Sequence, residues 1–493
     1  MNAIALPILI PLIMMVILMI VRNNKAAQWI SSAGTIALFV LSVYLLLEVN
    51  QKEVMVLYLG GWEAPFGITL VIDRLSAVML STTALIGFAI AVYATKFFTP
   101  AHRESRFYFF FFALLMGVNG AFITGDVFNL YVWFEVMLMS SFVLITLGSK
   151  RAQLEGAIKY LALNLIGSMF FLAGLGLLYG KTGTLNMAHL AQILIDDRNA
   201  ILMNTSAVLF FIAFGIKAAV FPLFFWLPAS YHTPNITVSS LFAGLLTKVG
   251  VYALIRFFTL FFVQEPAFWH NLLLVIAGFT MVIGGMSASI YYDSRRILSY
   301  HIISQIGYMV MGLGIFTPLA IAGAIFFTIH NMLAKTNVFL VAGIIRKLRG
   351  SFDLKKVGGL FNSNPAVAVV FIIPGLALAG VPPVSGFFAK FILIKAGFDA
   401  GQYLISGVAI LTGMLTLYSM IKIWNEAFLK AQPKEYEKEV KTRVTFAEIF
   451  PSALLAMASL LLGIFASPVF NYIMKAAEQL SDPVNYITSV LNL

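Results

Sequence analysis

The sequence consists largely of apolar runs of about 20 residues, each long enough to cross a hydrocarbon layer of ~30 Å as an α-helix. The runs are continuous, whereas the strands of a membrane β-barrel alternate polar and apolar residues, so helices are favoured. Hydrophobic residues make up 60% of the chain and charged residues 11%, which is too little polar surface for a water-soluble fold of 493 residues. The sequence therefore predicts an all-α polytopic membrane protein.

The runs predict fourteen transmembrane helices within one integral-membrane domain, residues 1–493. We place them at residues 3–21, 28–48, 69–95, 107–124, 127–148, 155–180, 200–227, 237–262, 270–291, 296–314, 319–345, 366–395, 403–427 and 447–470. The seventh helix contains Pro222, and the twelfth contains Pro374, Pro382 and Pro383. Because proline lacks an N–H and frees a carbonyl of the preceding turn, we expect both helices to be broken.

The distribution of lysine and arginine predicts the orientation, since short cytoplasmic loops hold the excess of basic residues. With the N-terminus outside, the inner loops carry 19 basic residues and the outer loops and tail carry 4. Both termini are therefore predicted outside, with residues 346–356 and 430–443 in the cytoplasm. The formal net charge of +11 then describes an inner membrane face, and no nucleic-acid partner is needed to explain it.

An internal repeat with an offset of 167 residues is visible in the sequence. It pairs Asn164 with Asn331 and, two helices earlier, Asp126 with Asp293. The offset covers five helices, an odd number, so the second copy would enter the membrane from the opposite side. We therefore predict inverted repeats at about 107–262 and 270–427, with peripheral helices in 1–98 and 447–470. Inverted repeats with broken helices are typical of transporters.

Ionisable side chains inside the apolar spans are the candidate functional residues, because a charge at the bilayer centre costs at least ~2.5–3.5 kcal/mol and normally has a partner or a wet cavity. The candidates are Glu135, Lys217, Lys248, His330, Lys335 and Lys390, with His301 nearer a helix end. One carboxylate and scattered histidines give no spacing for a metal site. The absence of cysteine excludes thiolate-bound iron–sulfur clusters, so no metal and no cofactor are expected.

Glu135 opposite a buried lysine is the least costly arrangement for this acid. The charge on such a lysine would depend on how close the acid is, which is a property that proton transfer needs. A static ion pair that fixes helix packing is the alternative for Glu135 and Lys217. Snorkelling to the interface is the alternative for Lys248 and Lys335. His330 fits a polar relay or a satisfied core histidine, and a role for Lys395 stays open.

The segment GLLYGKTGT around Lys181 has the appearance of a phosphate-binding loop. Its spacing is one residue short of the P-loop pattern, and it ends an apolar helix instead of following a strand. We therefore reject a nucleotide site there.

Four motifs together resemble the antiporter-like membrane subunits, a family that contains the proton-pumping subunits of respiratory complex I and the large subunits of multisubunit Mrp-type (Mnh) Na⁺/H⁺ antiporters. The motifs are GDVFNLYVWFEVMLMSS with Glu135, FGIKAAVFPLFFWLP with Lys217, GLLTKVGVYALIR with Lys248, and GVPPVSGFFAKF with Lys390. The resemblance covers nearly the whole chain and is greatest to the Mrp type.

The resemblance implies two inverted five-helix repeats with breaks in helices 7 and 12, and protons moving along a row of lysines gated by a Glu–Lys pair. It assigns roles to Glu135 and Lys217 (the pair), Lys248 (connecting lysine), His330 and Lys335 (eleventh helix) and Lys390 (terminal lysine). The family motif WLPDA is WLPAS here, at residues 226–230, so a proton-uptake role of that acid is not carried over.

The resemblance also implies a multi-pass subunit of the cell membrane that is a secondary transporter and not an enzyme. Its partners would be the large A-type subunit and several small membrane subunits, and its transported ions H⁺ and Na⁺. Three readings remain open: this antiporter subunit, a pumping subunit of a complex I-type oxidoreductase, and a single-chain carrier of an organic solute. A carrier needs a substrate pocket at the midplane, and none is evident in the sequence.

Overall fold

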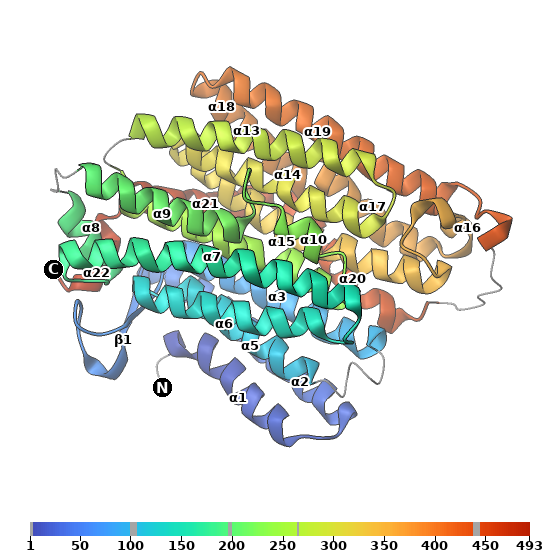
Figure 1. Cartoon of the computed structure of the whole chain (residues 1–493), viewed down its shortest axis with the longest axis horizontal. Coiled ribbons are helices and arrows are strands. Elements are labelled where there is room, and N and C mark those ends of the chain that lie inside the picture. The colour runs from blue at the N-terminus through green and yellow to red at the C-terminus, as the bar shows by residue number, and fades with distance from the viewer. Residues whose placement is uncertain (1–2, 99–105, 196–199, 264–265, 437–443) are drawn as a thin grey trace.

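A computed structural model describes residues 3–98, 106–195, 200–263, 266–436 and 444–493. Nearly all of this part of the chain is helical, and the long helices lie side by side in one bundle (Figure 1). Ten helical segments among the described residues are long and apolar enough to span a membrane. They contain α1 (Leu6–Ile20), α2 (Asn24–Lys52), α3 (Arg74–Phe97), α6 (Val127–Thr146), α7 (Arg151–Thr182), α11 (Ile236–Gly244) with α12 (Leu246–Leu260), α13 (Pro266–Ile290), α15 (Pro318–Arg349), α19 (Tyr403–Trp424) and α20 (Phe446–Ile464).

The remaining predicted spans correspond to further helices in the bundle, so the predicted all-α membrane class is confirmed. These helices are α5 (Phe107–Ile123), α9 (Ala200–Ala218), α14 (Ser294–Ile315), and α17 (Pro365–Ala379) with α18 (Ser385–Asp399). The sequence analysis placed no helix at α8 (Met187–Ile195), α16 (Leu360–Ser363) or α22 (Val484–Leu491). It did not separate α10 (Trp226–Ser230) and α21 (Ala466–Ser481) from the spans that they overlap.

The third predicted span, 69–95, was wrong at its start. Thr69–Ile72 is a strand, β2, which pairs antiparallel with β1 (Met55–Tyr58) so that Met55 faces Ile72. Both segments are rich in β-branched residues or other residues that favour strands. The helix begins only at Arg74, because the Asp73 carboxylate accepts a hydrogen bond from the Ser76 N–H and caps it.

The last predicted span, 447–470, was too long at its end. α20 stops at Ile464, and the chain turns at Phe465 into α21, which packs on α15 and α3. The interruption lies where α20 meets another broken helix: a Cβ on Gly463 would be 2.3 Å from the Pro383 carbonyl oxygen. The close approach of the two backbones requires glycine at this position.

Both proline-containing spans are interrupted, as predicted. The seventh span ends as α9 at Ala218 and resumes as α10 at Trp226, with Pro222 in the gap. The twelfth ends as α17 at Ala379 and resumes as α18 at Ser385, with Pro382 and Pro383 in the gap. Pro374 lies inside α17 without ending it.

Two equivalent contacts follow the 167-residue offset seen in the sequence. Asp126 forms an isolated β-bridge with Asn186, and Asp293 forms one with Asp353. Each aspartate also caps the helix that follows it, α6 or α14. These contacts agree with the predicted inverted repeats, whose boundaries stay a prediction.

The centre of the bundle is α15, which packs against α11, α14, α17, α18, α20 and α21. Its most apolar stretch is 94% buried, and that of the α11–α12 segment is 100% buried. α1, α2, α7 and α19 instead present many apolar side chains on the outside of the bundle. The helices at the centre thus hold the buried polar residues, and those at the periphery provide the surface that faces lipid or other subunits.

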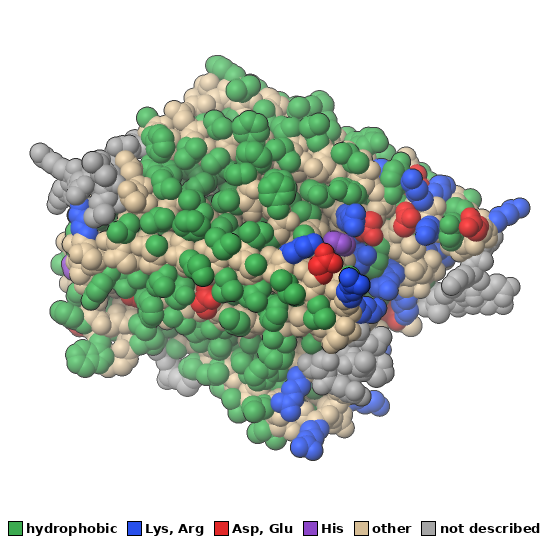
Figure 2. Space-filling model, viewed as in Figure 1, with side chains coloured by type: hydrophobic (Ala, Val, Ile, Leu, Met, Phe, Trp, Pro, Cys, Tyr) green, Lys and Arg blue, Asp and Glu red, His purple; other side chains and the backbone are tan. Residues whose placement is uncertain are grey.

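Lysine and arginine side chains gather at one end of the bundle, while its flank is covered by hydrophobic side chains (Figure 2). We call this the basic end; α16 lies there (Figure 1), and the loop before α16 contacts Arg295 and Arg346 through Phe352 and Lys430 through the Lys355 carbonyl oxygen. α1 begins and α22 ends at the opposite end (Figure 1).

Candidate functional site

A hydrogen-bonded chain joins the intramembrane acid to the first buried lysine. Ser168 on α7 donates a hydrogen bond to the Glu135 carboxylate on α6. The Lys217 ammonium on α9 donates to the Ser168 hydroxyl, with 3.2 Å from Nζ to Oγ. Lys217 also lies over the Phe134 ring, 4.8 Å from its centroid. The two charges therefore sit on either side of one hydroxyl group and not in direct contact, which the sequence analysis did not anticipate.

Glu135 and Lys217 differ in how deeply their side chains are buried in the bundle. Lys217 is 6% exposed, whereas Glu135 is only partly buried on the flank of the bundle. A partly exposed carboxylate at this depth is unfavourable against lipid. The flank around Glu135 is thus poorly suited to be a lipid-facing surface.

The break after α9 places Lys217 at the interrupted end of its own helix. Lys217 lies one residue before the end of α9, and the Trp226 indole N–H donates to the Ile216 carbonyl oxygen at 2.8 Å across the break. α12 packs against the same point, because a Cβ on Gly250 would be 2.5 Å from the Ala218 nitrogen. The break and this close packing fix where the lysine stands.

Lys248 on α12 is fully buried, and its ammonium donates to the Ala243 carbonyl oxygen on α11 at 2.6 Å. The carbonyl is available because the α11–α12 segment is interrupted at Leu245. Burial of this kind rules out the snorkelling alternative, in which the ammonium would reach the interface.

Lys335 and His330 lie on α15, one turn and a half apart along the central helix. Both are fully buried. His330 Nδ1 is 2.8 Å from the Ser385 hydroxyl at the start of α18, and that hydroxyl is 2.9 Å from Ser459 on α20. Within the described part of the chain, Lys335 Nζ and His330 Nε2 have no hydrogen-bond partner. Such groups are normally satisfied by water or by a movable partner.

Lys390 on α18 is bound to the break in the twelfth span. Its ammonium donates to the carbonyl oxygens of Leu378 at 2.8 Å and Ala379 at 3.0 Å, which end α17. Its Nζ also lies 5.5 Å from the centroid of the Tyr308 ring. Lys390 therefore uses backbone carbonyls in place of an acid, as Lys248 does.

The structure places the predicted residues on helices that contact one another, in an order from Glu135 to Lys390 that we call the row. α12, which carries Lys248, meets the backbone of Lys217 at Gly250, where a Cβ would be 2.8 Å from the Lys217 carbonyl carbon. Lys335 is close enough to Lys248 and Lys390 for their charges to interact, and Lys217 interacts in the same way with Glu135. Amines held by neutral carbonyls and hydroxyls can gain or lose a proton without breaking an ion pair. The row is thus suited to proton transfer and poorly suited to holding a rigid structure.

Sequence reasoning missed Ser168, which joins the acid and the lysine, and Lys422 at the basic end of α19. The 167-residue offset offered a signal for Ser168, because it pairs this residue with Lys335. Lys422 follows buried Thr416 and Ser419 at helical spacing, which was visible in the sequence. Lys395, left open above, forms an exposed ion pair with Asp399 at 2.5 Å and lies outside the row.

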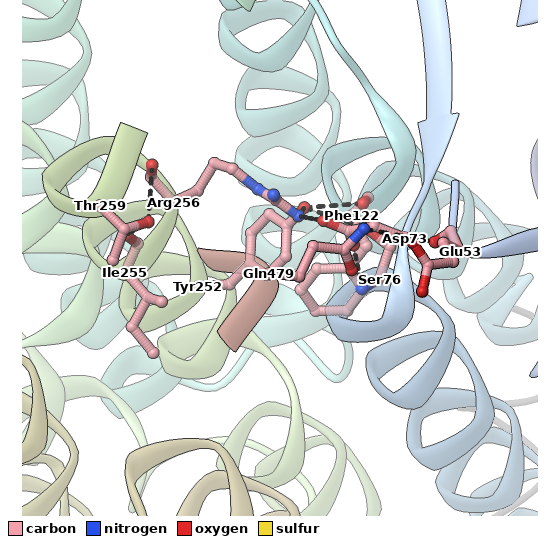
Figure 3. Close-up of polar contacts among 9 residues, drawn as sticks. All are labelled: Glu53, Asp73, Ser76, Phe122, Tyr252, Ile255, Arg256, Thr259 and Gln479. Atoms are coloured by element: carbon pink, nitrogen blue, oxygen red, sulfur yellow. Dashed lines mark hydrogen bonds and ion pairs between the residues drawn. The ribbon is translucent and has the colours of Figure 1, made fainter. Parts of the chain in front are cut away.

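A second buried polar cluster joins α12 to the start of α3, directly after β2 (Figure 3). Arg256 on α12 forms an ion pair of 2.6 Å with Asp73, the residue that caps α3, and both are almost completely buried. Arg256 also donates to the Tyr252 hydroxyl, which in turn donates to the Phe122 carbonyl oxygen on α5. The cluster ties three helices together two turns from Lys248.

The described residues form neither a metal site nor a phosphate loop. Among them, no group of three or more His, Cys, Asp or Glu side chains could hold a metal ion. The segment around Lys181 belongs to α7, which continues through Gly176 and Gly180 to Thr182. A continuous helix does not form the backbone cradle that a phosphate needs.

Comparison with known proteins identifies relatives over the full length of the chain. A family model described as "NADH:quinone oxidoreductase/Mrp antiporter, TM" matches residues 124–416. The chain is 44% identical to the D subunit of the Na⁺/H⁺ antiporter of Alkalihalophilus pseudofirmus and 39% identical to that of Bacillus subtilis, each over 99% of both chains.

Solved structures share the fold as well. A chain of the Mrp complex from Dietzia sp. DQ12-45-1b superposes with a TM-score of 0.91 at 29% identity, covering 99% of both chains. A chain of respiratory complex I from Thermus thermophilus has a TM-score of 0.86 at 23% identity over the same share, which establishes likeness of fold alone.

Proposed function

Because this chain belongs to the family of NADH:quinone oxidoreductase and Mrp antiporter membrane subunits, we propose that it is the proton-carrying D subunit of a multisubunit Na⁺/H⁺ antiporter. It is a multi-pass membrane protein and a transporter component, not an enzyme. The observation that carries the proton-transfer role is the chain from Lys217 through Ser168 to Glu135.

The Ser168 hydroxyl can pass a proton between the two charged groups. It gives its own proton to the Glu135 carboxylate and takes one from the Lys217 ammonium, so the net result is one proton moved and both charges neutralised. The reverse step restores the charges. Proton transfer through a positioned hydroxyl needs hydrogen-bond contact on both sides, and this geometry supplies it.

From Lys217 the proposed route continues through Lys248 and Lys335 to Lys390, with His330 beside it. Each of these three lysines can lose its proton at low cost. Lys248 and Lys390 bind neutral carbonyl oxygens, which stabilise an ammonium less than a carboxylate does, and Lys335 has no hydrogen-bond partner among the described residues. When Glu135 instead takes its proton from outside the pair, Lys217 is still protonated but has lost the anion next to it, and it then releases its own proton toward Lys248. This coupling of neighbouring charges makes Glu135 a gate.

Assembly with other membrane proteins is supported by the partial exposure of Glu135. A neighbouring membrane subunit on the α6 flank would cover the carboxylate and separate it from lipid. We propose the large A-type subunit and several small subunits as partners, with Na⁺ handled by a partner, since the candidate row here contains one acid and many cations. The basic end is assigned to the cytoplasm on the positive-inside rule.

The decisive experiment is Na⁺/H⁺ antiport in membrane vesicles that contain the whole complex. Glu135→Gln keeps the shape of the side chain but removes its charge, and we expect loss of antiport at normal complex abundance. Lys217→Arg and Lys390→Arg should fail as Lys→Ala does, because arginine holds its proton throughout this pH range. Near-normal antiport in the arginine variants would mean that these residues hold a charge and do not carry protons.

Gentle purification decides between an antiporter and an oxidoreductase as the parent complex. We expect a set of membrane subunits without flavin or iron–sulfur proteins to copurify with this chain. Peripheral redox subunits in the purified complex would support the pumping subunit of a complex I-type enzyme instead.

A further inference from the structure

Polar side chains lie among the apolar residues in the seam where α14 and α19 are in contact, although α19 lies at the periphery of the bundle. Thr412, Thr416 and Ser419 recur at helical spacing on the buried face of α19, and each has no exposed surface. The opposite face of the same helix carries Met414 and Ile421, which are 62% and 46% exposed. A peripheral helix would ordinarily bury an apolar face against its neighbour.

α14 presents matching polar side chains from the other side of the seam. Gln305 is fully buried and donates to the Thr416 hydroxyl, with 3.3 Å between Nε2 and Oγ1. His301, one turn toward the basic end, is also fully buried. It is close enough to Lys335, Lys390 and Lys422 to interact with the charge of each.

Several polar atoms in this seam have no protein partner among the described residues. They are both ring nitrogens of His301, the Ser304 hydroxyl, Gln305 Oε1 and the Thr412 hydroxyl. Leaving a buried polar atom unsatisfied costs about 1–3 kcal/mol, so a cluster of them is typical of a site that holds water.

The two ends of the seam meet functional groups. At its inner end, Gly413 lies next to Lys390, since a Cβ there would be in ordinary contact with Nζ at 3.7 Å. At the basic end, Lys422 donates to the carbonyl oxygens of Ser289 and Tyr291, each at 2.7 Å, where α13 ends. Ser289 also lies 3.5 Å from Ser419 through their hydroxyl oxygens. Polar groups thus continue from Lys422 to Lys390.

We infer that the α14–α19 seam is a hydrated proton path between the basic end and Lys390, with Lys422 at its mouth and Gln305 and His301 along it. That protons move along this path rests on the proposed function. That the path contains water does not. It gives the second half of the row its own connection to the face that we assign to the cytoplasm.

Water in the seam can be tested without measuring transport, because the chain contains no cysteine. Thr416→Cys and Ser419→Cys report on the seam, and Met414→Cys on the opposite face of α19 is the matched control. Inside-out vesicles containing the whole complex are treated with 2-aminoethyl methanethiosulfonate, and labelling is followed by mass spectrometry. We expect both seam cysteines to react about tenfold faster than the control, since the reactive thiolate forms only in contact with water.

Labelling of Thr416→Cys no faster than Met414→Cys, at normal complex abundance, would overturn the inference.

Antiport is then measured in Gln305→Leu and in Lys422→Met and Lys422→Arg. A proton path predicts at least about tenfold lower antiport in all three, because arginine cannot pass a proton on. Normal antiport in Lys422→Arg but not in Lys422→Met would mean that Lys422 only holds the end of α13 and does not pass protons into the seam. Fast seam labelling in a complex that exchanges no Na⁺ for H⁺ would support the seam while refuting the proposed function.

Discussion

At the scale of single residues, the buried charged side chains are stabilised in two different ways. Asp73 and Arg256 pair directly, and the pair is closed by further hydrogen bonds to Tyr252 and Ser76. The row of lysines avoids direct pairing and relies on carbonyl and hydroxyl oxygens. A direct buried pair resists any change of charge, whereas neutral partners permit it. A direct ion pair is therefore suited to stabilising the fold, and lysines bound to neutral oxygens are suited to proton transfer.

Ser168 is the residue on which the proposed relay depends. We expect Ser168→Ala to lower antiport by about 10²-fold or more, the range that a positioned proton-transfer group contributes. Ser168→Thr keeps the hydroxyl and should retain most activity, and it serves as the control. The measurement is Na⁺-driven proton movement in vesicles with matched complex levels. Equal activity of the alanine and threonine variants would exclude the hydroxyl from the path.

The Asp73–Arg256 pair should behave as a structural contact. Arg256→Met leaves the Asp73 carboxylate buried without its partner, and we expect a loss of about 3–5 kcal/mol in the free energy of unfolding. The double variant Asp73→Asn with Arg256→Met removes both charges and should recover a large part of that loss. Thermal unfolding of the purified complex measures both. A double variant less stable than Arg256→Met would contradict a simple buried pair.

At the scale of elements, broken helices create the sites that hold the lysines. An intact helix uses its carbonyl oxygens internally, so those of Ala243, Leu378 and Ala379 can bind an ammonium only because α11 and α17 end there. Glycine residues lie where a neighbouring backbone meets a broken helix. Gly250 against Ala218 and Gly463 against Pro383 are two such contacts beside the row.

Gly250→Ala tests this packing. The added Cβ would lie 2.5 Å from the Ala218 nitrogen, and backbone cannot move aside as a flexible side chain can. We expect a loss of about 1–3 kcal/mol in stability together with reduced antiport, because α12 would be pushed away from Lys217. Gly176→Ala is the matched control, since nothing lies within 4 Å of a Cβ there. Unfolding midpoints of the two complexes are compared, and an unchanged Gly250→Ala complex would refute the role of the contact.

At the scale of the whole molecule, the basic end and the apolar flank define how the bundle sits in a membrane (Figure 2). The positive-inside rule assigns the basic end to the cytoplasm and the β-hairpin to the other side. On this assignment, which we propose, α1 begins and α22 ends outside. The Asp126 bridge adjoins the β-hairpin, where the Gly125 N–H donates to the Thr69 carbonyl oxygen, and the Asp293 bridge adjoins Phe352 at the basic end. These positions agree with the inverted repeat that we predict.

Single cysteines at exposed positions test the orientation. Glu63→Cys in the hairpin loop should react with an impermeant maleimide in intact cells, and Asn362→Cys on α16 only after the membrane is opened or inverted. The cysteine-free chain gives no background from its own residues. Reaction of both positions from the same side would show that the number of membrane crossings between them is not what the helices imply.

Much of the fold could be predicted from the sequence, because in a membrane every backbone group must be satisfied within a helix or a closed barrel. Helix positions, the breaks at Pro222 and Pro382, and the identity of the buried charges follow from apolar length and proline chemistry alone. Where prediction failed, tertiary contacts decided. Thr69–Ile72 became a strand because β1 was available to pair with it, and α20 ended at Ile464 because it meets the broken twelfth span.

The contacts within the row were decided only by the tertiary structure. The sequence determined that Glu135, Lys217, Lys248, Lys335 and Lys390 lie in lipid-spanning helices, since a charge within an apolar run is visible at once. It did not determine that Ser168 stands between the first two, or that Lys248 and Lys390 bind backbone carbonyls. Those partners lie on other helices or across a break, and their positions depend on close backbone packing that no local pattern records.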